Sequence, residues 1–362
     1  MVDQSLFDLA VKSLYAFTFF ISFLYSLTLD ISNTVTKLTF KSSNVIVSIV
    51  LIIYCFLVGL RDLTIGSDTL SYFGIWQNVN NFEFEGEYVF GALMFVLKNS
   101  GFSFSFFLFI IVLMFSVYVY KSFKLLGYTF GINPFLLLFS FISFFFFESI
   151  TINVIRQGLA LSFLLYSWTL YVTHSRKKYY IFYLFLAVLT HTTSIIPIVL
   201  FILISKFGHK VQIRYYLILY ILGVFLAVIN YGVLNIAPFL QDVMGDSRRV
   251  SYFTDDNDLY TVGFKPQFVV FNTLFLLVGY FLTKRCILEN WYIILLKYFI
   301  VSSFIFFMWF QIPYSDRIGL YCWIVIPMLL APFFNYKKDR FKLTTLVCVS
   351  LLVIYLFFKM YF

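Results

Sequence analysis

Residues Asn44–Leu60, NVIVSIVLIIYCFLVGL, form an apolar run that contains no charged residue. Its length is close to the roughly 20 residues that a helix needs to cross a bilayer. The run ends abruptly at Arg61–Tyr72, RDLTIGSDTLSY, where charged, polar and turn-forming residues follow one another. Long apolar runs alternate with short polar segments along the rest of the chain, and this pattern predicts a membrane protein built from helices.

The composition of the chain supports the same interpretation. Its 362 residues are 62% hydrophobic and only 12% charged, with a mean hydropathy of +0.92. A soluble domain could not bury so much apolar surface, and the residue alternation typical of outer-membrane barrel strands is absent. We therefore predict an all-α, polytopic integral membrane protein that forms a single domain over residues 1–362, with about 10–12 transmembrane helices.

The apolar runs give the expected positions of the membrane helices. They lie at about 13–29, 44–60, 104–121, 133–147, 154–173, 214–236, 267–283, 291–310, 317–335 and 342–360. Two longer loops separate them, at about 61–103 and 237–266. Within the first loop, Tyr88–Lys98 is apolar but short, so we expect a helix that lies at the membrane surface.

The distribution of charge predicts the orientation of these helices. Lys and Arg gather in short loops such as 174–178 and 336–342, whereas the loops between them are mainly acidic. Because basic loops stay in the cytoplasm, the two longer loops and the N-terminus are expected outside. The N-terminus has no basic segment and no cleavage site, so we expect the first helix to be retained. The net charge of +9 reflects this orientation, and we expect no nucleic-acid partner.

The segment 175–208 has basic residues at both ends, which conflicts with a single crossing. Its apolar run is interrupted at Thr190–Ser194 and again at Pro197. Two short spans at about 175–190 and 192–208 would resolve the conflict and place His191 at the external apex. A hairpin that re-enters without crossing, or a single span that departs from the charge rule, are the alternatives.

Several charged or titratable residues are expected at the external face, at or just inside helix ends. These residues are Arg61, Asp68, Glu148, Arg156, Gln157, His191, Asp316 and Arg317. A charge in the first turns of an apolar helix, such as Arg156, is costly unless it faces a partner or a water-filled cavity. Each residue also has a plain structural interpretation: a solvated loop, a snorkelling arginine, a local Asp–Arg ion pair or a histidine that ends a helix.

Other kinds of chemistry find little support in the sequence. It contains no HExxH, G-x-S-x-G or Walker motif. The four cysteines lie in or beside apolar runs and are expected to be buried free thiols. The acidic clusters Glu83–Glu87 and Asp255–Asp258 could hold a hard cation, but acidic loops are usually just solvated. We predict no metal and no cofactor.

The order of four short motifs resembles the EpsG-like, Wzy-type bacterial polysaccharide polymerases. The motifs are Arg61-x4-Gly66-x-Asp68-x3-Tyr72, the helix start NVIRQGLA at Asn153–Ala160, LTHTTS at Leu189–Ser194, and Asp316-Arg317. Each motif is short and weak alone, and their order is moderately specific. The resemblance covers residues from about 55 to 320.

The resemblance implies a multi-pass enzyme of the bacterial inner membrane. Its members join undecaprenyl-diphosphate-linked oligosaccharide repeat units at the external leaflet, in the synthesis of O-antigen, capsule or exopolysaccharide. The implied partners are this lipid-linked oligosaccharide, the lipid bilayer, a chain-length regulator and a flippase.

Site roles follow from the resemblance and from the residue types. Arg61, Arg156 and Arg317, with Gln157 and Tyr72, are expected to bind the diphosphate and the sugars, because a guanidinium fork suits phosphate oxygen atoms. Asp68 and His191 are the candidate catalytic bases, with Asp68 preferred. The alternatives are a transporter or flippase of lipid-linked sugars, which needs charges along a central path, and an O-antigen ligase.

Overall fold

The structure, a computed structural model, describes residues 2–31, 37–79, 87–174, 177–237, 262–285, 290–335 and 342–361. Within these ranges the chain is helical and contains no β-strand, only two isolated bridges, Val2 with Arg61 and Ile132 with Asn335. Six helices in the described ranges are long and apolar enough to cross a membrane, or seven if one bent pair forms a single span. The predicted all-α, polytopic membrane fold is therefore confirmed.

The described residues form two compact units, which we describe separately. The first unit comprises Met1–Ile196 and Leu330–Phe362, and the second comprises Pro197–Leu329. The prediction of one membrane domain stays a prediction. Most of the predicted external loop at 237–266 lies outside the described residues.

The first unit contains most of the helices. They are α1 (Gln4–Ile31), α2 (Lys37–Gly59), α3 (Thr69–Asn78), α4 (Tyr88–Asn99), α5 (Phe104–Phe130), α6 (Pro134–Ile142), α7 (Phe145–Glu148), the π-helix η1 (Ser149–Asn153), α8 (Ile155–Val172), α9 (Lys177–Thr190), the 3₁₀ turn η2 (Thr192–Ser194), the 3₁₀ turn η4 (Ala331–Phe334) and α19 (Thr344–Tyr361).

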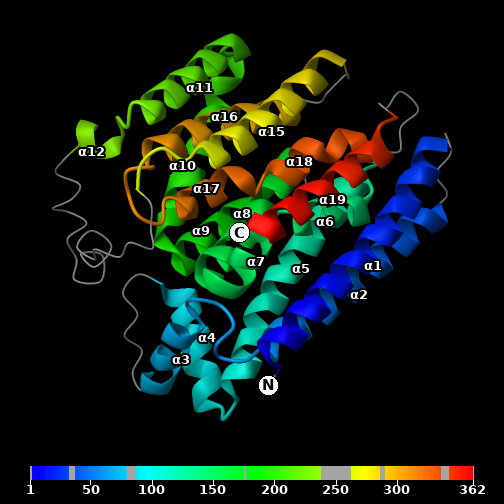
Figure 1. The fold of residues 1–362 in the computed structure, drawn as a ribbon, viewed down its shortest axis with the longest axis vertical. Helices are drawn as coiled ribbons and strands as arrows, with labels where there is room; N and C mark the ends of the chain where they lie inside the picture. The colour runs from blue at the N-terminus through cyan, green and yellow to red at the C-terminus, as the bar shows by residue number, and fades with distance from the viewer. Residues whose placement is uncertain are drawn as a thin grey trace. The chain divides into compact units, whose positions relative to one another are not determined.

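Helix α8 is the centre of the first unit. Nearly all of its side chains are buried, and it packs between α5 and α9, while α5 also packs on α2 and α6. Helices α3 and α4 lie at the same end of the unit as the N-terminus (Figure 1). An aromatic cluster attaches them to α5: the rings of Trp76 on α3 and of Phe90 on α4 lie 5.3 Å and 5.4 Å from that of Phe107 on α5.

One predicted span of the first unit is broken. The segment predicted as a straight helix at 133–147 consists of α6 and α7, and α6 lies at 86° to the helical segment Phe145–Asn153. Helix α6 ends at Ser143, whose hydroxyl donates to the carbonyl oxygen of Phe139, and Phe144 is extended. A serine that bonds back to its own helix and an extended residue together turn the chain away from the helix axis.

The break predicted at Thr190–Ser194 is confirmed. Helix α9 ends at Thr190, η2 covers Thr192–Ser194, and α10 runs over Ile195–Lys206. The two helices have 14 and 12 residues, so each is only about 20 Å long at 1.5 Å per residue. Whether the pair crosses the membrane or re-enters it stays a prediction.

The second unit holds most of α10 and the elements that follow it. These are the 3₁₀ turn η3 (Gly208–Lys210), α11 (Ile213–Val228), α12 (Val233–Ile236), α15 (Pro266–Arg285), α16 (Asn290–Met308), α17 (Asp316–Trp323) and α18 (Ile326–Leu330). Helix α16 packs against α11, α15 and α17. The span predicted at 214–236 ends early, at Val228, and the span at 317–335 is interrupted before Pro327, which has no N–H for the helical ladder.

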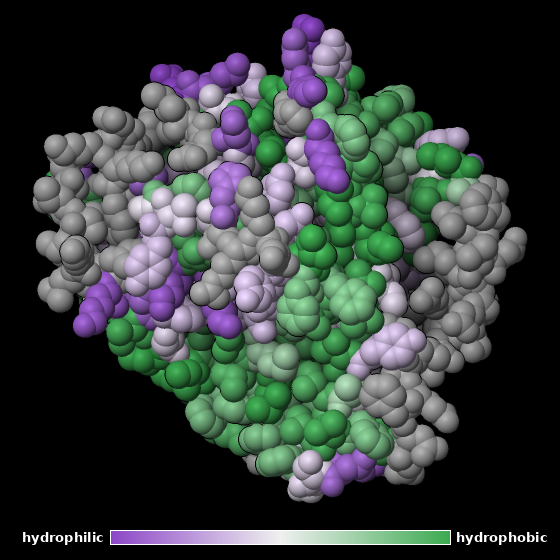
Figure 2. Space-filling model, turned by 180° about the vertical axis from the view of Figure 1, so that it is seen from behind, coloured by the Kyte–Doolittle hydropathy of each residue, from purple (hydrophilic) through white to green (hydrophobic). Residues whose placement is uncertain are grey.

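Both units carry large apolar side chains on their surfaces. On α1 of the first unit Leu9 and Phe20 are exposed, and on α11 of the second unit Ile221 and Phe225 are exposed. Hydrophobic side chains are contiguous over much of the face in Figure 2. Such a surface is stable in contact with lipid, which supports the membrane assignment.

Candidate functional site

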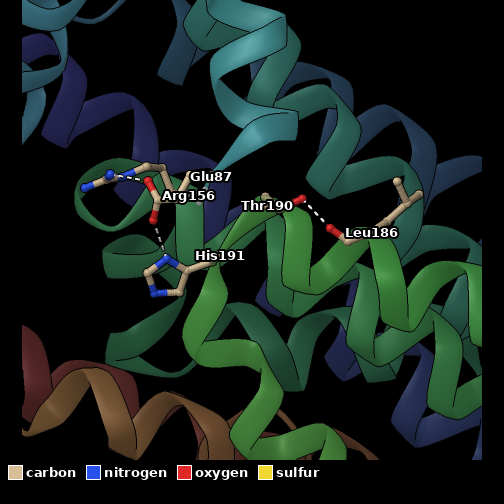
Figure 3. A network of polar contacts seen from close by, with 5 residues as sticks. All are labelled: Glu87, Arg156, Leu186, Thr190 and His191. Carbon is tan, nitrogen blue, oxygen red and sulfur yellow. Dashed lines mark hydrogen bonds and ion pairs between the residues drawn. The ribbon is translucent and has the colours of Figure 1, made fainter. Parts of the chain in front are cut away.

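Three segments of the first unit bring a carboxylate, a guanidinium and an imidazole together (Figure 3). Glu87, directly before α4, forms an ion pair through Oε2 with Nη1 of Arg156 at the start of α8. Its other oxygen, Oε1, lies 2.8 Å from Nδ1 of His191 at the end of α9. The side chains of Glu87, Arg156 and His191 are 17%, 35% and 21% exposed, so the cluster is partly buried but still open to solvent. We call Glu87, Arg156 and His191 the polar cluster.

Gly158 allows the chain before Arg156 to fold closely onto α8. A Cβ atom at this position would lie 1.9 Å from the carbonyl oxygen of Ile150 in η1, a distance that no real contact reaches. The amide of Val154 closes the π-helix by donating to the carbonyl of Ser149, 3.0 Å away. The π-helix therefore doubles back beside α8, and Arg156 lies in the first turn after this bend. Single π-turns often occur at functional sites.

The loop that carries Gly66 and Asp68 is anchored to the same bend. The amide of Ser67 donates to Oδ1 of Asn153 over 3.0 Å. Gly66 has a φ of +92°, and a Cβ there would lie 2.6 Å from Cγ2 of Ile152. Only glycine adopts such a backbone without strain and also permits this close approach. The motifs around Gly66 and Asn153, predicted to act together, are thus in direct contact.

Arg61 is a buried link between these segments. It is 1% exposed, and its guanidinium donates to the carbonyls of Val58 and Ile152, both at 3.0 Å, and to Oγ1 of Thr69 at 3.2 Å. Burial lowers the pKa of Arg61 to about 10, although nearby Tyr54 and Tyr72 oppose this shift. The guanidinium therefore stays charged at neutral pH. Its burial argues against the predicted contact with diphosphate and favours a positioning role.

Tyr72 lies next to Arg156, whose guanidinium carbon is 5.4 Å from the centre of the Tyr72 ring and 6.0 Å from that of Phe90. Stacking of this kind holds a guanidinium by cation–π attraction. Tyr72 is only 3% exposed, and its ring packs against Arg156. The predicted sugar contact of Tyr72 stays a prediction.

Asp68 is partly exposed and lies directly before α3. The hydroxyl of Ser67 donates to its Oδ1 over 3.1 Å, and its own carbonyl accepts the amide of Tyr72 over 3.0 Å. Asp68 is therefore one helical turn from the ring that stacks on Arg156. It remains a second candidate for the base.

His191 is fixed by the break between α9 and α10. Its backbone is extended, with φ −154° and ψ 113°, its amide donates to the carbonyl of Ala187, and its carbonyl accepts from Ser194. The hydroxyl of the preceding Thr190 bonds back to Leu186, so the last turn of α9 is complete (Figure 3). The second ring nitrogen of His191 lies on the side away from Glu87 (Figure 3). If Nδ1 carries the proton and donates to Glu87, Nε2 is able to accept one.

Glu87 was expected only as part of the acidic cluster Glu83–Glu87 and not as a catalytic or substrate-binding residue. Burial alone would raise the pKa of its carboxyl, but the hydrogen bond with His191 and the charge of Arg156 outweigh that effect and lower the pKa. The carboxylate is therefore ionised at neutral pH. In the sequence Glu87 is the last of three closely spaced acids, after Glu83 and Glu85. It differs from them only in directly preceding the apolar segment that starts at Tyr88.

Two further predicted residues, Gln157 and Arg317, are not members of the polar cluster. Gln157 follows Arg156 but is only 3% exposed. Arg317 belongs to the second unit, where its guanidinium carbon is 4.9 Å from the centre of the Tyr314 ring. Of the seven predicted residues, the cluster thus unites Arg156 and His191 with a carboxylate from a different loop.

Metal binding has no support in the described part of the chain, where no group of three or more His, Cys, Asp or Glu could hold an ion. The acidic positions Glu83, Glu85 and 255–258 lie outside the described residues. Cys55, Cys322 and Cys348 are buried free thiols, as predicted, and Cys286 is outside the described residues.

The polar cluster can do two kinds of chemistry. A guanidinium stacked on two rings can bind an anionic oxygen, and an imidazole oriented by a carboxylate can accept a proton from a hydroxyl.

A comparison with known proteins assigns the chain to a family. The model of the EpsG family matches residues 44–362, a range that contains the whole cluster and both anchoring motifs. No curated protein and no solved structure matches the chain. With its helical membrane fold and a match over most of its length, this chain belongs to the EpsG family.

Proposed function

We propose that this protein polymerises undecaprenyl-diphosphate-linked oligosaccharide repeat units at the external face of the bacterial inner membrane, in the synthesis of a surface polysaccharide. Membership of the EpsG family supports the proposal. The observation that carries it is the double contact of Glu87, which holds a proton acceptor, His191, and an anion-binding group, Arg156, on one carboxylate.

The reaction needs a group that removes a proton. A sugar hydroxyl of the incoming unit attacks the anomeric carbon that links the growing chain to its lipid diphosphate. The new C–O bond forms as the bond to the diphosphate breaks, and Nε2 of His191 takes the hydroxyl proton. Glu87 orients the ring through Nδ1 and stabilises the imidazolium that results, as the carboxylate does in a catalytic triad.

The reaction also needs a cation beside the leaving group. The lipid diphosphate gains negative charge as it departs, and a guanidinium placed beside it lowers the barrier. Arg156 is the cation of the cluster, and its position is set by the Tyr72 and Phe90 rings as well as by Glu87. In this proposal Arg61 supports the site from the interior.

The geometry favours His191 over Asp68 as the base. His191 has a carboxylate partner, Glu87, which fixes its ring and leaves Nε2 on the side away from that carboxylate. This reverses the order of preference that the sequence suggested. Asp68, one turn from Tyr72, is then assigned to bind the acceptor sugar.

Purified protein in nanodiscs with one lipid-linked repeat unit tests the proposal. A polymerase yields a ladder of longer lipid-linked chains and releases lipid diphosphate. His191→Gln and Arg156→Ala are expected to abolish the ladder, whereas Glu148→Gln is expected to keep it. Glu148 is a suitable control because it also pairs with a cation, Lys359, at 2.7 Å, and makes no contact with the cluster.

Two results would overturn the proposal. Movement of the lipid-linked unit across a liposome membrane without any ladder would identify a flippase. Transfer of one unit to a different acceptor, again without a ladder, would identify a ligase.

A further inference from the structure

The second residue of the chain pairs with the motif that follows α2. Val2 and Arg61 form an isolated parallel bridge. The amide of Val2 donates to the carbonyl of Leu60 over 2.9 Å, and the amide of Asp62 donates to the carbonyl of Val2 over 3.0 Å. One residue near the N-terminus therefore holds the backbone on both sides of Arg61. Neither the sequence nor the proposed reaction gives this contact a role.

The residue after Val2 ties the segment to α1. Oδ1 of Asp3 accepts from the amide of Leu6 over 2.8 Å and from the hydroxyl of Ser5 over 2.9 Å. The carbonyl of Asp3 accepts the amide of Phe7 over 2.9 Å. A side chain that accepts in this way satisfies a donor that the first turn of a helix leaves free. Because Val2 adjoins this cap, its position is fixed relative to the first turn of α1.

The side chain of Arg61 links this pairing to the polar cluster in two directions. Its Nη2 donates to the carbonyl of Ile152 in η1 over 3.0 Å, four residues before Arg156. The same nitrogen donates to Oγ1 of Thr69 at the start of α3 over 3.2 Å, three residues before Tyr72. The guanidinium of the cluster and the ring that stacks on it are thus both attached, through Arg61, to the loop that Val2 holds.

The position of the Arg61 guanidinium depends on the register of its backbone. In paired backbone, a slip of one residue turns the side chains to the opposite face, and the two hydrogen bonds of Val2 flank Arg61 and prevent such a slip. The turn that follows is fixed separately, because Oδ1 of Asp62 accepts from the amide and the hydroxyl of Thr64 at 3.0 and 2.9 Å. Loss of the Val2 pairing should therefore loosen Arg61 without unfolding the turn.

We propose that Val2 is a positioning residue of the polymerase site, whose backbone pairing holds Arg61 in the register that places η1, α3 and so Arg156. The effect on polymerisation rests on the proposed function, whereas the effect on η1 rests on these contacts alone. Only the backbone of Val2 takes part. Its amide should therefore matter, and the identity of its side chain should not.

The test separates the amide of Val2 from its side chain. Val2→Pro removes the N–H that donates to Leu60, whereas Val2→Ala keeps both backbone hydrogen bonds and is the matched control. All proteins carry the same short tag before Met1, so that residue 2 has a peptide bond on each side. Hydrogen exchange over residues 149–158 measures the order of η1. The rate of ladder formation in nanodiscs measures the consequence for the reaction.

Val2→Pro is expected to speed hydrogen exchange over residues 149–158 and to lower the maximal rate of ladder formation. Each change should be about 2- to 10-fold, the range that follows from the loss of one neutral hydrogen bond. The KM for the repeat unit should stay the same, because Arg156 acts on the departing diphosphate. Val2→Ala should match the parent in every measurement. In an Arg61→Met background Val2→Pro should add no further change, since both act through one side chain.

Equal effects of Val2→Pro and Val2→Ala would overturn the inference, and so would effects of Val2→Pro that add fully to those of Arg61→Met. Faster exchange with an unchanged rate of ladder formation would also overturn it. Val2 lies outside every helix, so Val2→Pro should fold. If it does not, Val2→Gly keeps the amide but loosens the segment, and it gives the same test with a smaller expected change.

The two measurements distinguish this inference from the proposed function. If exchange responds as expected but the parent protein forms no ladder, the proposed function fails and the link from Val2 to η1 stands. If the parent forms a ladder and Val2→Pro changes neither exchange nor rate, the inference fails and the function stands.

Discussion

Oε1 of Glu87 lies 2.8 Å from Nδ1 of His191, although 104 positions of sequence separate the two residues. Neither residue lies within a regular helix: one directly precedes α4 and the other directly follows α9. Their contact depends on the packing of α4 against α9, and with Arg156 it fixes the geometry of the polar cluster.

Glu87→Gln is expected to reduce the polymerisation rate by as much as about 10,000-fold, the loss seen when the carboxylate of a Ser-His-Asp triad becomes an amide. The amide keeps the shape of the side chain but removes the charge that orients His191 and holds Arg156. The rate of lipid diphosphate release measures the effect. Glu148→Gln is the matched control, and an equal loss in both variants would contradict a specific role for Glu87.

His191→Gln is expected to cost about 100- to 10,000-fold in rate if the imidazole is the general base. Asp68→Asn should mainly weaken binding of the acceptor sugar. The KM for the repeat unit should therefore rise more than the maximal rate falls. Initial rates at several acceptor concentrations separate the two effects. A larger loss of maximal rate in Asp68→Asn than in His191→Gln would restore Asp68 as the base.

Arg156→Lys is expected to rescue activity only partly relative to Arg156→Ala, since lysine keeps the charge but loses the planar fork and its stacking on Tyr72. The thermal stability of Arg156→Ala should also fall, because the partly buried carboxylate of Glu87 loses its guanidinium partner. A double variant with Glu87→Gln should recover part of that stability. The expected coupling energy is about 0.5–3 kcal/mol. Strict additivity would show that the ion pair contributes nothing.

Gly158→Ala is expected to lower the free energy of unfolding by about 1–3 kcal/mol, the usual cost of forcing an extra carbon into a packed interior. The new Cβ would meet the carbonyl oxygen of Ile150, so the π-helix must move and activity should fall with stability. Gly74→Ala on α3 is the matched control: nothing lies within 4 Å of its added carbon. That variant should be neutral or stabilised by about 0.5–1 kcal/mol, as alanine favours a helix over glycine. Similar losses in both variants would show that the close approach to Ile150 is unimportant.

The contribution of Glu87 to stability is expected to depend on pH. Its folded-state pKa lies below the ordinary value of 4.5, so the ionised carboxylate stabilises the fold above that pH. This stability is lost as the pH falls through the lower, folded-state pKa. Thermal unfolding of parent and Glu87→Gln proteins should therefore differ at neutral pH and converge in strong acid. A difference that grows on acidification would contradict the lowered pKa.

Some of this architecture can be predicted from local sequence and some cannot. The break at His191 was predictable because Thr190–Ser194 interrupts an apolar run with residues that favour turns, and Pro197 follows. The bend at Ser143 was not, since its neighbours are as apolar as those of a straight span. Residues of the motifs that contain Gly66 and Asn153 were expected to bind one substrate, and the hydrogen bond from Ser67 to Asn153 joins the two segments.

The site was predictable only in part because burial depends on tertiary packing. Arg61 follows the end of one apolar run, and Arg156 lies near the start of another. The side chain of Arg61 is nevertheless buried, whereas that of Arg156 is 35% exposed. Nothing in the local sequence separates them. Glu87 was overlooked for the same reason: it resembles its acidic neighbours until α4 packs against α9.

The sharing of one carboxylate by Arg156 and His191 has an electrostatic consequence. With a neutral imidazole the cluster carries no net charge, since the carboxylate cancels the guanidinium. In the proposed reaction the imidazole takes the hydroxyl proton, so the cluster would become positive at the moment when the departing diphosphate becomes more negative. The site therefore attracts the leaving group most strongly during bond cleavage, and loss of the proton to water returns it to neutrality and weakens its hold on the spent carrier. In the proposed reaction, each added repeat unit is accompanied by one cycle of protonation and deprotonation at His191, beside a carboxylate of Glu87 that stays charged.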